Sequence, residues 1–252
     1  MLEQLLSAEI FSAFLVFCRL GAAFSILPGI GETFVTMRAR LLLAIAVSFV
    51  LSPVVASSLP QMPASPVAMI MIIVQELGIG LFLGVVARTI LAALQTAGMI
   101  IGFQTGLSSA LVFDPNFSGQ SAVTAAFLSM IGMVLIFATN SHHVMLSALA
   151  DSYVSLPAGR LPPLDDLTAA IVRVTGDSFS LGVRIAAPFL VFGVVFFLGL
   201  GLLARLMPQI QVFFLAVPLQ IVLGLAVFVL TLTIGMSVFL ESFRNSLLAF
   251  GR

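Results

Sequence analysis

The stretch from Val67 to Gly102 reads VAMIMIIVQELGIGLFLGVVARTILAALQTAGMIIG, and it decides the class of fold. Its 36 residues carry only two charged side chains, Glu76 and Arg88. As a helix it would span about 54 Å, at about 1.5 Å per residue, whereas the hydrocarbon core of a bilayer is roughly 30 Å thick. The stretch therefore predicts a membrane helix that either bends or extends outside the bilayer.

The composition of the whole chain agrees with a membrane protein. Of its 252 residues, 61% are apolar and 8% are charged, and the mean hydropathy is +1.24. An ordinary soluble domain has roughly 25% charged residues, enough to cover its surface. This chain is too poor in charge to cover an apolar interior of its size, which excludes a soluble enzyme, a nucleic-acid-binding protein and a disordered protein.

The remaining apolar runs also read as helices, because they are long and nearly free of charge. Proline-rich residues 57–66 predict a loop, and residues 140–166, the most polar part of the chain, predict another. The fold class expected is all-α, a helical membrane protein with about six spans. The six apolar segments are Leu5–Leu27, Leu41–Ala56, Val67–Gly102, Ser121–Thr139, Ile185–Ala204 and Val212–Leu240.

Three ionisable side chains, Arg19, Glu76 and Arg88, fall inside these apolar runs. Each costs about 2.5–3.5 kcal/mol at the bilayer centre on insertion scales, so each needs a partner, a water-filled cavity or a position outside the lipid. Glu76 and Arg88 lie about 18 Å apart along one helix and cannot pair with each other. A transporter would use such groups for ions or protons, and a membrane assembly would use them as buried ties between subunits.

Glycines recur at the spacing that lets helices approach closely. Gly80 and Gly84 form one GxxxG step, and Gly98, Gly102 and Gly106 form two more in succession. Close packing of helix backbones is the expected use of this motif in membrane proteins. The pattern predicts helix contacts and does not name a function.

Residues 102–120, GFQTGLSSALVFDPNFSGQ, interrupt the helical pattern with Gly, Ser and Pro but stay apolar. Irregular backbone at membrane depth is tolerated only inside protein or along a cavity. A plain re-entrant turn fits this segment. A loop that lines a cavity fits it as well, with Phe103, Phe113 and Phe117 able to occlude the opening.

Candidates for catalysis are few, which predicts that the chain is not an enzyme. The two histidines, His142 and His143, are adjacent, whereas zinc-binding histidines on a helix are four residues apart. Asp151 is the nearest acidic residue. No GxSxG, HExxH or glycine-rich phosphate loop is present, so no catalytic residue, metal site or cofactor is expected.

Several motifs, in their order along the chain, resemble the FliR family, the flagellar branch of the export-gate proteins of type III secretion systems. They are VQELGIGLFLGVV at 74–86, QTAGMIIGFQTGLSSALVFDP at 95–115, NSH at 140–142, LPAG at 156–159 and ARLMPQIQVFFLAVPLQIVLG at 204–224. Arg19, Pro28, Arg38 and Pro53 fit the family's N-terminal pattern. The close relatives of this family in virulence injectisomes remain an alternative.

This resemblance implies a subunit of a hetero-oligomeric protein export gate at the bacterial inner membrane, within the flagellar basal body and partly on the periplasmic side. FliP and FliQ would join the chain in the gate core, FlhB and FlhA would associate with it, and unfolded flagellar subunits would pass through. Residues 1–166 would be FliP-like, and 167–252 would form a FliQ-like hairpin. The hairpin tip would include Arg205, Pro208 and Gln209.

The resemblance also implies that residues 103–120 form a loop that plugs the pore. Arg19, Glu76 and Arg88 are expected, as buried charges, to serve in assembly. The residues expected in the plug are Phe103, Gln104, Gly106, Leu107, Val112, Phe113, Asp114, Pro115 and Phe117.

Overall fold

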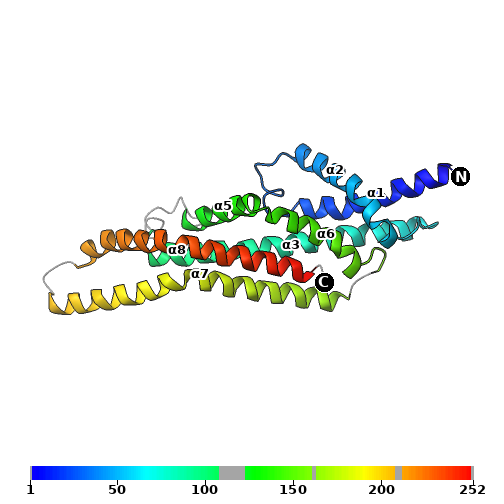
Figure 1. Ribbon diagram of the computed structural model, residues 1–252. Helices are drawn as coiled ribbons and strands as arrows, with labels where there is room; N and C mark the ends of the chain where they lie inside the picture. Colours follow the sequence, from blue (N-terminus) through cyan, green and yellow to red (C-terminus); the bar gives the residue numbers. More distant parts are fainter. Residues whose placement is uncertain (1, 108–122, 161–162, 208–211, 251–252) are drawn as a thin grey trace. The chain divides into compact units, whose positions relative to one another are not determined.

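The computed structural model describes residues 2–107, 123–160, 163–207 and 212–250, and these residues form helices and no strands (Figure 1). The all-α fold class is therefore confirmed. The helices are α1 (Leu2–Phe24), α2 (Met37–Val55), the short 3₁₀ helix η1 (Ala56–Ser58), α3 (Pro66–Gln104), α5 (Val123–Ala138), α6 (Ser141–Ser155), α7 (Leu164–Leu206) and α8 (Val212–Phe250).

Four of these helices are long and apolar enough to cross a membrane: α2 continued through η1, α3, α7 and α8. A fifth span is possible if α5 and α6, which are separated by a short break, count as one bent span. The expectation of about six spans is thus too high by one or two. One reason is that α5 has only 16 residues, or about 24 Å, which is less than the hydrocarbon core.

The other predicted span that is missing from the candidate spans is Leu5–Leu27, which corresponds to α1. Many of its apolar side chains lie inside the protein instead, although Ile10 and Phe14 are exposed. Leu15, Val16, Leu20, Ala23 and Phe24 have no exposed surface. An apolar run therefore predicted a helix correctly here, but not the surroundings of that helix.

The long apolar stretch Val67–Gly102 lies within a single helix. α3 has 39 residues and a length of about 58 Å, so it extends well beyond the thickness of a hydrocarbon core. α7 is longer still, with 43 residues; it begins well before the predicted apolar segment Ile185–Ala204 and contains Pro188. Likewise, Pro218 lies within α8.

The predicted loop at 140–166 is wrong for most of its length, because residues 141–155 form α6. Within this polar segment Met145, Ala148, Leu149, Ser152 and Tyr153 are all buried. Their spacing of i, i+3, i+4, i+7 and i+8 places them on one face of a helix. The density of polar residues concealed this helical pattern.

The chain divides into two compact units that interleave along the sequence. The first consists of Met1–Ile90, Phe137–Thr175 and Phe243–Arg252, and the second of Leu91–Ile136 and Gly176–Ser242. The predicted division into 1–166 and 167–252 concerns likeness to other proteins and remains a prediction. Its boundary falls close to the start of α7 at Leu164.

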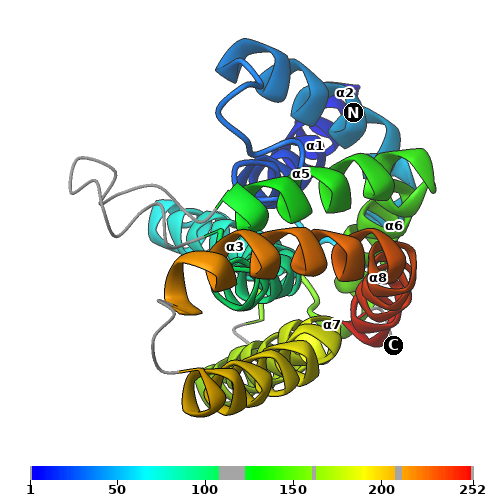
Figure 2. The same ribbon diagram turned by 90° about the vertical axis from the view of Figure 1, so that its left-hand side faces the viewer.

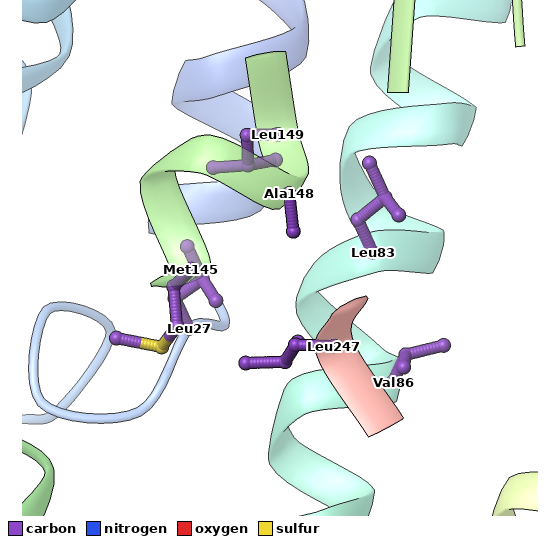
Figure 3. A pocket seen from close by; sticks show the side chains of 7 residues that line it. All are labelled: Leu27, Leu83, Val86, Met145, Ala148, Leu149 and Leu247. Carbon is purple, nitrogen blue, oxygen red and sulfur yellow. The ribbon is translucent and has the colours of Figure 1, made fainter. Parts of the chain in front are cut away.

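The first unit packs α6 and the N-terminal part of α3 around α1. A small gap of about 10 Å³ remains in this core, lined by apolar side chains from α3, α6 and α8 and by Leu27 (Figure 3). The side chains are Leu27, Leu83, Val86, Met145, Ala148, Leu149 and Leu247. This gap offers a water molecule no polar side chain to bind, because all of its lining side chains are apolar.

In the same unit, α1 and α2 lie side by side (Figure 2). An apolar groove of about 900 Å³ lies between them. Phe14 and Phe17 line it from α1, and Ile45, Phe49 and Pro53 from α2. Side chains of α2 are exposed on its other faces as well, Val50 and Val54 by 70% each. α2 is therefore only lightly packed against the rest of its unit.

The second unit joins α5, the end of α3, and most of the hairpin formed by α7 and α8 (Figure 1). Phe228 of α8 connects three helices, since its ring centre lies 6.0 Å from that of Phe127 in α5 and 6.1 Å from that of Phe189 in α7. α3 and α5 meet where Thr124 donates a hydrogen bond of 2.6 Å to the carbonyl of Gly98.

Candidate functional site: a buried ion pair and the end of helix α3

Arg19 and Glu76 form an ion pair with no exposed side-chain surface on either residue. Nε of Arg19 donates to Oε2 of Glu76 at 2.7 Å, and Nη2 donates to Oε1 at 3.0 Å. This is the bidentate geometry in which a guanidinium binds a carboxylate most strongly. Because both Glu76 oxygens are bound, the pair satisfies the requirement that buried charges have partners.

The other donors of Arg19 reach α6. Nη1 donates to Oγ of Ser152 at 3.0 Å, and Nη2 donates to the carbonyl of Leu156 at 3.0 Å. The guanidinium also lies over the ring of Tyr153, 3.8 Å from its centre, where a cation–π attraction adds to the pairing. Arg19 therefore joins α1 to α3 and α6, and it supplies positive charge at the C-terminal end of α6.

Arg19 and Glu76 thus meet inside one chain, a pairing that the sequence did not predict. Their expected role in joining subunits remains a prediction. Sequence reasoning missed Ser152 and Tyr153 as partners. Tyr153 carried a signal, since it is the only tyrosine of the chain and stands in a polar segment.

Arg88 occupies a different environment. Its Nη2 lies 3.9 Å from Oε1 of Glu32, and half of the Arg88 side-chain surface is exposed. Nη1 donates to the carbonyl of Ile26 at 3.4 Å. Such a long, half-exposed pair contributes little stability. Arg40 binds more closely to the link between α1 and α2. Its Nε and Nη2 donate to the carbonyls of Ile30 and Glu32 at 3.0 Å each.

Three of the four predicted packing glycines lie at close helix contacts. A Cβ on Gly80 would collide with the carbonyl oxygen of Arg19, and one on Gly84 would lie 3.0 Å from the carbonyl oxygen of Ala23. A Cβ on Gly98 would likewise collide with the backbone of Ala125. Gly102, the fourth, is buried near the end of α3.

The predicted plug segment begins where α3 ends. Phe103 is 72% exposed, and Gln104 is the last residue of the helix. Gly106 has a positive φ of 74°, which any other residue would adopt only under strain, and Leu107 follows it. The other expected plug residues, Val112, Phe113, Asp114, Pro115 and Phe117, lie outside the described residues.

The end of α3 contacts both helices of the C-terminal hairpin. Nε2 of Gln220 in α8 donates to the carbonyl of Gln104 at 2.8 Å, and Gly193 of α7 faces the Gln104 side chain. Gln220 is another residue that sequence reasoning missed. Its signal was that it is the only side-chain amide in the apolar stretch 212–240.

At the predicted hairpin tip, Arg205 lies near the end of α7 and is exposed. Pro208 and Gln209 lie outside the described residues.

His142 stacks on a phenylalanine, and its ring packs at a tilt against that of His143. The ring centres of His142 and His143 are 4.2 Å apart, and the His142 ring lies 5.2 Å from that of Phe137. Asp151 is exposed. In the described part of the chain, no three His, Cys, Asp or Glu side chains come together in a group that could hold a metal ion.

The sequence matches known proteins over nearly its whole length. Residues 10–246 match the model of the family described as "Bacterial export proteins, family 1". The chain is 39% identical to "Flagellar biosynthetic protein FliR" of Caulobacter vibrioides, over 95% of each protein. It is 32% identical to the protein of the same name in Escherichia coli, over 82% of this chain and 79% of that one. For the Bacillus subtilis protein the identity is 31%, over 94% and 91%.

Since the family model covers the chain almost from end to end, and the relatives align over most of their own length, this multi-helix membrane protein belongs to family 1 of the bacterial export proteins.

Proposed function

We propose that the chain is a subunit of the flagellar type III protein export gate, which forms the entry channel for unfolded flagellar subunits across the bacterial inner membrane. FliP and FliQ join it in the gate core, and FlhB and FlhA associate with that core. The observation that carries this proposal is the alignment, over 95% of both chains, with a relative named as a flagellar biosynthetic protein. The family to which the chain belongs is one of export proteins.

The length and exposure of the helices support a role within an assembly. α7 is about 64 Å long, roughly twice the thickness of a hydrocarbon core. Apolar side chains are exposed along the hairpin, among them Leu198 at 65% and Leu202 at 64% in α7, and Val229 at 72% and Leu230 at 76% in α8. Lipid can cover only the part that fits within the bilayer. Neighbouring subunits would have to cover the rest, because exposed apolar surface of this extent marks interaction sites.

Within the gate, residues 103–120 close the pore in the absence of substrate. Two features support this role. The segment is apolar but interrupted by Gly, Ser and Pro, and it begins at the end of α3. Deleting Gly106–Asn116 is expected to make cells leak potassium while the gate still assembles. Unchanged potassium efflux from cells with an assembled gate would argue against the plug.

The carrier alternative, in which Glu76 binds an ion or a proton, has less support. Both oxygens of Glu76 are bound by Arg19, and the carboxylate is fully buried. An ion would have to displace Arg19 and leave its guanidinium buried without a counter-charge, which costs several kcal/mol. The injectisome alternative has less support too, since the relatives compared above are all named as flagellar proteins.

The first test is purification of the tagged chain from its native cell in a mild detergent, with mass analysis of the proteins that accompany it. We expect a large complex that contains FliP and FliQ. Recovery of the chain alone or as a small homo-oligomer would contradict the gate proposal. Recovery with injectisome proteins would move the chain to the virulence branch.

A further inference from the structure

The last turn of α3 has an unusual partner in the C-terminal hairpin. The final carbonyls of a helix have no donors within the helix and must find them elsewhere. The carbonyl of Gln104 finds one in the side-chain amide of Gln220, 116 residues later in α8, at 2.8 Å. Gln220 is only 7% exposed, so little water competes for this bond.

Burying an amide at this position costs free energy unless the amide makes a hydrogen bond. Its neighbours Leu219 and Ile221 and most of α8 are apolar. A leucine would pack among them without the cost of removing an amide from water. What the glutamine adds is a directed bond to one backbone atom at the end of another helix.

Glycines allow the hairpin to hold this turn closely. A Cβ on Gly106 would lie 3.3 Å from Cδ of Gln220, and one on Gly224 would lie 2.7 Å from Cγ2 of Thr105. A Cβ on Gly193 of α7 would collide with the Gln104 side chain. Both helices of the hairpin therefore present a glycine to residues 104–105, and Gly106 makes its left-handed turn directly against Gln220.

We infer that Gln220 is a positioning residue for the pore segment: it fixes, through the carbonyl of Gln104, the turn at Gly106 from which that segment departs. This inference rests on the proposed function, because it assigns a purpose to the turn that precedes the plug. The C-terminal hairpin would then determine where the plug begins. A change in the hairpin would therefore change the position of the segment that closes the pore.

The experiment compares two variants that keep most of the side-chain volume. Gln220→Leu removes the amide, and Gln220→Glu keeps the length but loses both donors. Gln95→Glu is the matched control, because Gln95 is exposed on α3 in the same unit and gains the same charge. Each variant is purified in its gate complex and studied by hydrogen exchange with mass spectrometry. Potassium efflux is measured in cells.

We expect both Gln220 variants to exchange the amides of residues 103–107 roughly threefold to tenfold faster than the wild type, the factor for one lost hydrogen bond. Peptides from α5 should be unchanged, and potassium efflux should rise. Gln95→Glu should match the wild type in both measurements. Unchanged exchange at 103–107 in an assembled complex would overturn the inference.

The deletion of Gly106–Asn116 separates this inference from the proposed function. If the deletion causes a leak and the Gln220 variants exchange faster without one, Gln220 does not position the plug, and the gate proposal stands. If the deletion causes no leak, the plug role fails, and the assignment of Gln220 as its positioning residue fails with it, whatever the exchange rates. A leak from both, with faster exchange, supports the inference.

Discussion

Arg19 and Glu76 stand 57 residues apart in the sequence, yet their side chains meet at 2.7 Å with no exposed surface on either. The glycine one helical turn after Glu76 makes this possible. Gly80 lies against the backbone carbonyl of Arg19, where any side chain would collide. Glu76, Gly80 and Gly84 share one face of α3, so the charge and the close approach belong to a single helix contact.

The first prediction concerns the removal of one partner of this pair. Arg19→Met should destabilise the chain by about 3–5 kcal/mol, because it leaves the Glu76 carboxylate buried without a counter-charge. The double variant Arg19→Met with Glu76→Leu should recover much of that loss, since it buries no charge at all. The apparent melting temperature of the purified complex in detergent measures both. A double variant as unstable as the single one would show that the pair is not the cause.

The second prediction uses two glycines on the same helix. Gly80→Ala should destabilise the protein by about 1–3 kcal/mol, because its Cβ collides with backbone that cannot move aside. Gly78→Ala should be neutral or stabilise by up to about 1 kcal/mol. Its Cβ meets nothing within 4 Å, and alanine favours a helix. Thermal unfolding of the two variants in parallel tests this, and equal effects would refute the close contact.

The third prediction concerns the link between α1 and α2. Arg40→Gln should loosen it, since Arg40 donates to the carbonyls of Ile30 and Glu32. Cleavage of residues 25–36 by a broad-specificity protease should become roughly tenfold faster, as expected for the loss of about 1.4 kcal/mol of local stability. Arg38→Gln is the control, because Arg38 is exposed two residues earlier. Similar cleavage rates for both variants would count against the role given to Arg40.

The fourth prediction separates packing from chemistry at the histidines. His142→Phe with His143→Ala keeps a ring against Phe137 and removes all four imidazole nitrogens. We expect swimming motility to be retained, because what His142 contributes in this arrangement is a ring stacked on Phe137. The control is His142→Ala with His143→Ala, which also removes the stacked ring. If motility were lost in the first variant while the chain remained at its normal level in the membrane, a chemical role for the histidines would have to be considered.

The α-helical fold could be predicted from the sequence because the signal is local. Runs of apolar residues such as Val67–Gly102 specify a helix wherever they lie, and α3 indeed covers that run. The family, too, could be predicted from short motifs in a fixed order. α6 was missed because its buried residues are interspersed with polar ones at 141–155, so that mean polarity concealed the helical period.

The sequence by itself determined that this chain is a helical membrane protein of an export family, with buried charges that need partners and glycines that need close neighbours. Only the tertiary structure decided which partners these are. Arg19 binds Glu76 and the end of α6, and Gln220 binds the end of α3. The physical reason is that helix formation depends on neighbours within about four residues, whereas an ion pair or an amide bond across 57 or 116 residues depends on how helices pack.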